Sequence, residues 1–133
     1  MDSPKFQPGF RLSVLDRAVI LLGGITTMTA AYTIPWLGFV IGFVMLHFFL
    51  FCNVFRISRP LELAWAALFL TLAGGTLLAE FPGWQLTAAI SLAASFCLVA
   101  WAMTRPSYHG LGWQWINPGL RQWWEAQRQD SEA

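Results

Sequence analysis

The chain has 133 residues, of which 56% are hydrophobic and only 11% are charged, and its formal net charge is +1. Soluble domains contain roughly 45–50% apolar and about 25% charged residues, so the composition argues against a soluble domain and favours burial in a membrane. The eight tryptophans fit a membrane protein, because Trp collects at bilayer interfaces. A net charge this small, without a basic stripe, argues against a nucleic-acid partner.

The first long apolar stretch, residues 18–55, predicts two helices rather than one. At 1.5 Å per residue a single helix would be nearly twice as long as the roughly 30 Å hydrocarbon layer is thick. Pro35 disfavours helix in the residue before it, and its neighbours Tyr32 and Trp36 suit the headgroup level. We therefore expect helices over 14–33 and 36–55, the first beginning with a capping box made by Ser13 and Asp16.

The second half of the chain repeats this plan. Its apolar stretches predict helices over 61–79 and 85–103, joined by a turn that contains Pro82 and Trp84, and Pro60 suits the first position of the third helix. The predicted fold is an all-α integral membrane protein with four transmembrane helices arranged as two tight helical hairpins. This bundle occupies residues 13–103, after an N-terminal segment 1–12.

Residues 104–133 form a polar, Trp-rich tail. A short amphipathic helix is expected after Asn117 and Pro118, with an apolar edge on an otherwise polar segment. The apolar edge consists of Leu120, Trp123 and Trp124. Such a helix is expected to lie on the membrane surface or on a partner protein.

The distribution of basic residues predicts the orientation. All eight Lys and Arg residues fall on one side of the four-helix arrangement: Lys5, Arg11, Arg17, Arg56, Arg59, Arg105, Arg121 and Arg128. The positive-inside rule then places both termini and the central loop in the cytoplasm, so we expect a multi-pass protein of the bacterial inner membrane.

His47 is the most informative single residue, because it falls near the middle of the second predicted helix. An ionisable group inside a membrane is a candidate functional residue. One interpretation is structural, with the imidazole hydrogen-bonded to a hydroxyl such as that of Thr26, Thr27 or Thr29, or to a backbone carbonyl. Neutral imidazole is also an axial ligand of haem iron or chlorophyll magnesium, and a proton-coupled role is a third possibility.

Small residues at helical spacing predict helix packing, since they let helices approach closely in lipid. They are Gly23, Gly24, Gly38, Gly42, Gly74, Gly75, Ala89, Ala93, Ser91 and Ser95. Interfacial or lipid contacts are expected from Arg56, Arg59 and Arg105 and from Trp36, Trp84, Trp113, Trp115, Trp123 and Trp124. The isolated cysteines Cys52 and Cys97 show no metal-ligand spacing.

The sequence contains no acid–base pair or activated nucleophile that would indicate an enzyme. We therefore expect a non-catalytic accessory or scaffolding subunit, bound to lipids and to other integral membrane subunits. One alternative is a pigment- or haem-binding protein that uses His47 in electron transfer or light harvesting. The other is a small oligomeric transporter or channel, whose path would be lined by the hydroxyl groups of Thr26, Thr27, Thr29, Tyr32 and Thr33.

Overall fold

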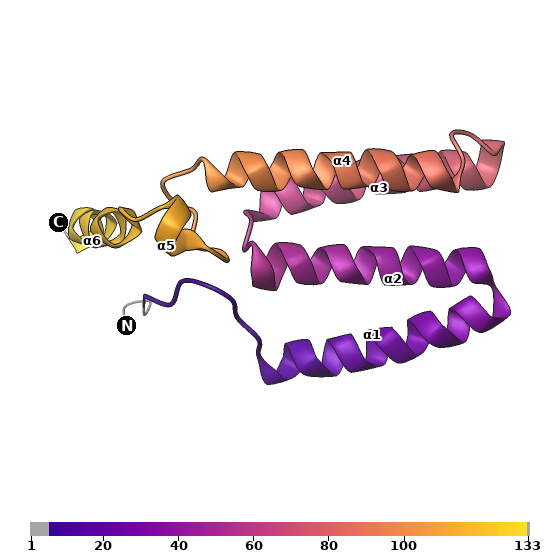
Figure 1. Ribbon diagram of the computed structural model, residues 1–133, viewed down its shortest axis with the longest axis horizontal. Helices are drawn as coiled ribbons and strands as arrows, with labels where there is room; N and C mark the ends of the chain where they lie inside the picture. The colour runs from indigo at the N-terminus through magenta and orange to yellow at the C-terminus, as the bar shows by residue number, and fades with distance from the viewer. Residues whose placement is uncertain (1–5, 133) are drawn as a thin grey trace.

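The computed structural model describes residues 6–132, which are helical apart from the segment before the first helix and the connections between helices (Figure 1). The elements are α1 (Val14–Thr33), α2 (Pro35–Phe49), the π-helix η1 (Leu50–Val54), α3 (Arg59–Ala79), α4 (Trp84–Met103), α5 (Trp113–Ile116) and α6 (Leu120–Glu132). With α2 and η1 taken together, four helices are long and apolar enough to cross a membrane. Their ends lie within two residues of the predicted ones.

The four long helices form two antiparallel hairpins (Figure 1). Both hairpin turns lie at one end of the molecule, the turn end, and the segment before α1 and the tail after α4 lie at the other, the terminal end. Trp36 and Trp84, which follow the two turns, stack with ring centroids 5.9 Å apart and planes 12° apart. The aromatic residues expected at one membrane interface thus join the two hairpins.

Local signals in the sequence explain where the helices begin. The predicted capping box is confirmed, because the Ser13 amide donates to the Asp16 carboxylate (2.7 Å) and the Asp16 amide donates to Ser13 Oγ (3.1 Å). Pro60 lies in the first turn of α3, where a missing N–H breaks no hydrogen bond.

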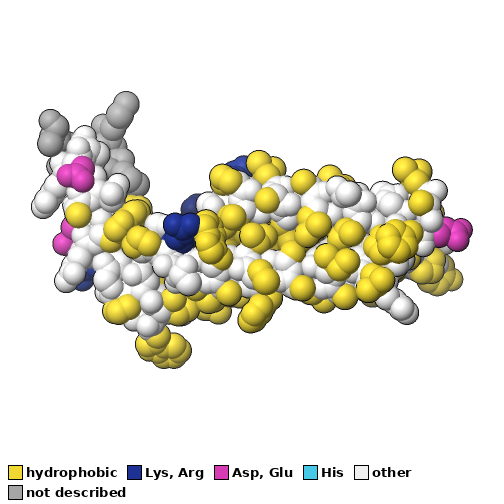
Figure 2. Space-filling model, turned by 90° about the horizontal axis from the view of Figure 1, so that it is seen from above, with side chains coloured by type: hydrophobic (Ala, Val, Ile, Leu, Met, Phe, Trp, Pro, Cys, Tyr) yellow, Lys and Arg dark blue, Asp and Glu magenta, His cyan; other side chains and the backbone are white. Residues whose placement is uncertain are grey.

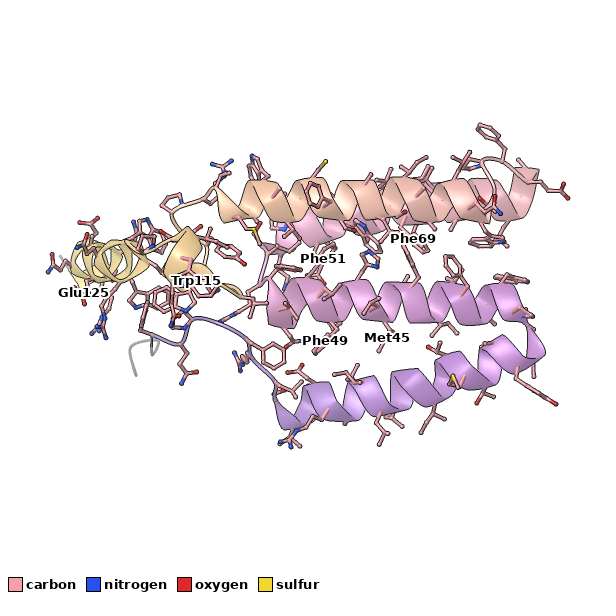
Figure 3. All side chains as sticks on the ribbon, viewed as in Figure 1. Met45, Phe49, Phe51, Phe69, Trp115 and Glu125 are labelled. Carbon is pink, nitrogen blue, oxygen red and sulfur yellow. The ribbon has the colours of Figure 1, made fainter. Side chains whose placement is uncertain are left out.

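The core lies between α2–η1 on one side and the α3–α4 hairpin on the other. Its buried residues are Phe51, Trp65, Phe69 and Ala73. Figure 3 shows Phe51 and Phe69 directed into the space between these helices. Trp65 and Phe69 stack in parallel, with centroids 5.4 Å apart.

Helix α1 lies at the edge of this arrangement and packs against α2 (Figure 1). Among its residues only Ala30 is buried. The closest approach involves Gly38 of α2, because a methyl group at this position would overlap the backbone of Ala31. The expected bundle is therefore a core of three helices with a fourth attached at one side.

The π-helix η1 forms backbone hydrogen bonds with both terminal segments. A π turn replaces the usual i−4 bond by an i−5 bond, as in Phe55 N–H to Leu50 C=O (2.8 Å). Just before, the Asn53 carbonyl accepts the Arg11 amide (3.2 Å) and the Val54 carbonyl accepts the Leu111 amide (2.8 Å). Both segments are thereby fixed to the end of the second long helix.

Candidate functional site

His47 is 2% exposed and belongs to the aromatic core. Its ring stacks on Trp65, with centroids 4.3 Å apart and planes 15° apart, and its centroid lies 4.3 Å from that of Phe43. Nδ1 lies 2.8 Å from the Phe43 carbonyl and therefore carries the proton, since a carbonyl oxygen only accepts. This geometry corresponds to the structural interpretation, with a backbone carbonyl as the partner.

A cavity of about 160 Å³ lies beside His47 and is also lined by Ser95 and Phe96 of α4. Pockets that hold drug-sized ligands enclose about 300–1,000 Å³, so this one is too small to enclose a porphyrin. A haem or chlorophyll bound through His47 would have to extend outside the cavity. Binding of either cofactor stays a prediction.

The hydroxyl groups of α1 bond within their own helix. Thr26 donates to the Leu22 carbonyl (2.8 Å), Thr29 to the Ile25 carbonyl (2.9 Å) and Thr33 to the Thr29 carbonyl (3.1 Å). These bonds occupy the donors that a polar transport path would present. They favour a structural role for these hydroxyls, and transport stays a prediction.

The small residues fall into two groups. Those facing other helices include Gly38, Gly42 and Ser91, and a methyl group at Gly42 would lie 2.8 Å from Thr27 Cγ2. Ser95 lines the cavity beside His47, Gly23 faces Met45, and Gly75 approaches the carbonyl of Phe81. The second group faces outward: a methyl group at Gly24 or Gly74 would meet no atom within 4 Å, and Ala89 and Ala93 are exposed.

Three of these glycines line a groove between α1 and α2. The groove has a volume of about 340 Å³, and Gly23, Gly24, Thr27, Gly42 and Met45 are among its lining residues. Met45 and Phe49 extend from α2 toward α1 (Figure 3). Because almost all the exposed lining atoms are apolar, this groove suits a hydrocarbon surface rather than a polar ligand.

Basic side chains gather at the terminal end, and Figure 2 shows the helical body beside them covered with hydrophobic side chains. Arg56, Arg59 and Arg105 line one pocket of about 440 Å³, which we call the large basic pocket. Glu62 also lines it and accepts a hydrogen bond from Cys52 Sγ (3.4 Å). The structure thus brings together the three arginines that were expected to contact lipid. Lys5 lies outside the described residues.

A second, smaller pocket of about 220 Å³ shares Arg56 and His109 with the large basic pocket and adds Arg11. Burial lowers the pKa of the Arg56 guanidinium from its ordinary value, and the positive charge of Arg11 lowers it further. These arginines come from segments far apart in the sequence. The sequence shows that Arg11 and Arg56 are basic, and only the fold shows that they line the same cavity.

The tail folds back on the chain. Leu120 is fully buried, Trp123 is half-buried, and Trp124 packs edge-on against Phe6 with centroids 5.8 Å apart. The apolar edge of α6 therefore contacts the N-terminal segment, and its expected contact with a membrane or partner stays a prediction. Trp113 also packs against Phe6 (5.9 Å), whereas Trp115 is 90% exposed.

Tyr108 of the tail is buried and lines the large basic pocket. Its hydroxyl donates to the Leu111 carbonyl (2.8 Å), and burial raises the pKa of the phenol above its ordinary value. The Asn117 amide, expected near the start of the terminal helix, donates to the carbonyls of Pro106 (2.6 Å) and Tyr108 (3.1 Å). These bonds hold the loop after α4 in place.

No family model, curated protein or solved structure matches this chain. Among residues 6–131 there is also no group of three or more His, Cys, Asp or Glu side chains that could hold a metal ion. The groove and the basic pockets are therefore the features of this chain that indicate a function.

Proposed function

We propose that this chain is an integral membrane protein and a non-catalytic accessory or scaffolding subunit of a larger membrane complex. Four helices of sufficient length and apolarity support the membrane assignment. The basic residues at the terminal end support an orientation with both termini in the cytoplasm of a bacterium. In this proposal a transmembrane helix of the partner lies in the groove between α1 and α2.

The main support for the proposal is the open space beside Gly24. Glycine within a helix costs about 0.8–1.0 kcal/mol relative to alanine, and a methyl group at Gly24 would meet no atom within 4 Å. Packing inside this chain therefore gives no reason for glycine at a position that lines the groove. A second helix gives one, because glycine lets two helix backbones approach closely in lipid.

The second hairpin also has small residues that face outward. Ala89 and Ala93 lie one helical turn apart on α4 and are both exposed. Gly74 of α3 has open space where its methyl group would be. A subunit surrounded by partner helices needs small residues on more than one face, and a protein surrounded only by lipid does not.

The test is cross-linking in the native membrane. A cysteine introduced at Gly24 is expected to form a cross-link to a transmembrane segment of a larger protein, identified by mass spectrometry of the linked peptides. Gly24→Leu is expected to fill the groove and to abolish co-purification of the same protein. It should leave the amount of folded chain unchanged, because the added side chain points into open space.

The matched control is Ala18→Leu, which adds a similar volume to an exposed position of α1 outside the groove. Co-purification should survive this change. The proposal fails if the cysteine links only to a second copy of this chain, or if both leucine variants retain the larger protein equally.

A further inference from the structure

The smaller basic pocket is built from three separate parts of the chain. Phe6, Gln7, Pro8 and Arg11 come from the N-terminal segment, Arg56 from the connection between η1 and α3, and His109 and Trp124 from the tail. The cavity exists only when all three parts are assembled at the terminal end.

Positive charge is concentrated in this pocket. Among the described residues no acidic side chain lines it, although two guanidinium groups do. The charges of Asp16 and Arg11 are close enough to interact. The Asp16 carboxylate, however, accepts a hydrogen bond from the Ser13 amide in the capping box of α1. Two arginines held together in a partly buried cavity repel each other unless an anion lies between them.

Trp124, one of the residues that line the pocket, carries an unused hydrogen-bond donor. Trp124 Nε1 is buried and has no partner in the described part of the chain. An indole N–H only donates, so it requires an acceptor oxygen. The Nδ1 atom of His109 lies 2.8 Å from the Ser107 carbonyl, which fixes the orientation of the imidazole ring beside the cavity.

The frame of the pocket is fixed before any ligand arrives. Arg56 has a positive φ of 50°, and its Nη1 donates to the Gln7 carbonyl (2.5 Å). The Gly9 amide donates to the His109 carbonyl (2.7 Å). Because these bonds already hold the lining segments in place, little further entropy is lost when an anion binds.

We infer that this pocket binds the phosphate group of an anionic ligand, either a phospholipid headgroup or free phosphate. The planar guanidinium groups of Arg11 and Arg56 match phosphate oxygens in pairs, and the Trp124 indole supplies a further donor. The volume of about 220 Å³ is below that of sites for whole drug-sized molecules, which fits a single phosphate group.

The experiment measures equilibrium binding to the full chain in a nonionic detergent by isothermal titration calorimetry. The probes are inorganic phosphate, a short-chain phosphatidylglycerol and the phosphate-free diacylglycerol with the same chains. Phosphatidylglycerol is expected to bind and the diacylglycerol is not. Binding of inorganic phosphate as well would identify free phosphate as a ligand, and its absence would identify the lipid headgroup.

Two substitutions test the site and a third controls for charge. Arg11→Gln is expected to weaken binding about tenfold, the loss that follows removal of one charge-assisted hydrogen bond. Trp124→Phe removes the N–H, keeps an aromatic ring, and is expected to weaken binding several-fold. Arg17→Gln removes the same charge outside the pocket and should leave the affinity unchanged.

The inference is overturned if neither phosphate-containing probe binds, or if Arg17→Gln weakens binding as much as Arg11→Gln. It is also overturned if Arg11→Gln and Trp124→Phe both bind normally. Circular dichroism and gel filtration of each variant verify that the fold is intact. The result is independent of the partner proposed for the groove.

Discussion

The two hairpins differ in what their polar side chains contact. In the second hairpin some of them join helices, although Thr71 and Ser95 bond within their own helix. The Thr76 and Thr87 hydroxyls lie 2.9 Å apart between α3 and α4, and Trp65 Nε1 donates to the Ser91 carbonyl (3.0 Å). In the first hairpin the Thr26 hydroxyl of α1 donates to the Leu22 carbonyl in the preceding turn of the same helix. A hydroxyl in apolar surroundings can bond to a carbonyl of its own helix, and it holds two helices together only where a second helix faces it.

This difference distinguishes residues that stabilise the fold of this chain from residues that are exposed and could contact another protein. The core of α2, α3 and α4 is closed by aromatic stacking and hydrogen bonds between helices. Most of α1 is exposed, including Leu21, Leu22 and Met28. Substitutions in the core should therefore change stability, whereas substitutions on the outer face of α1 should change association.

The largest expected effect is that of Trp65→Ala. Trp65 is 4% exposed, stacks on His47 and Phe69, and bonds the Ser91 carbonyl. Its truncation should lower the free energy of unfolding by about 3–5 kcal/mol, measured by denaturant titration in mixed micelles. Leu70→Ala on the same helix, at a site that is 68% exposed, should cost far less. Equal losses would contradict the core described above.

The next effect compares two glycines of the first hairpin. Gly38→Ala should destabilise the chain by about 1–3 kcal/mol, because the methyl group would overlap the backbone of Ala31. Gly24→Ala should be neutral or stabilising by up to about 1 kcal/mol, since nothing lies within 4 Å and helix propensity improves. The same unfolding titration measures both. If Gly24→Ala is as harmful as Gly38→Ala, the groove is not open.

The sequence predicts the helices well because the signals are local. Length and hydropathy place four helices, and Pro35, Pro60 and the Ser13 capping box mark where they begin. The charge distribution predicts that both termini share one end, which agrees with the arrangement in Figure 1.

The site could not be predicted in the same way, because it depends on contacts between distant residues. Arg11 and Arg56 meet only because η1 presents the carbonyls to which the terminal segments bond. A π-helix differs from an α-helix by one residue in its hydrogen-bond spacing, and the hydropathy of residues 36–55 contains no sign of it. The outward direction of Gly24 likewise follows from the position of α1 at the edge.

A smaller effect is expected from the buried hydroxyl pair. Thr76→Val removes the bond to Thr87 while keeping the side-chain volume. It should cost about 0.6 kcal/mol, the average for such bonds between membrane helices, and at most about 1.7 kcal/mol. Thr29→Val on α1 removes only a bond to the Ile25 carbonyl of the same helix. Its effect on the unfolding titration should be close to zero, and a loss as large as that of Thr76→Val would contradict the comparison between hairpins.

An effect of similar size is expected from His47→Phe, which also separates the two interpretations of this residue. Phenylalanine keeps an aromatic ring against Trp65 and Phe43 and loses only the bond from Nδ1 to the Phe43 carbonyl, so the cost should be about 1 kcal/mol. If His47 is structural, the absorption spectrum of protein purified from its native membrane between 350 and 900 nm is the same with and without the substitution. A Soret or chlorophyll band that is present in the natural protein and lost in His47→Phe would instead show that the imidazole is an axial ligand, since phenylalanine preserves the packing but has no nitrogen to donate to a metal.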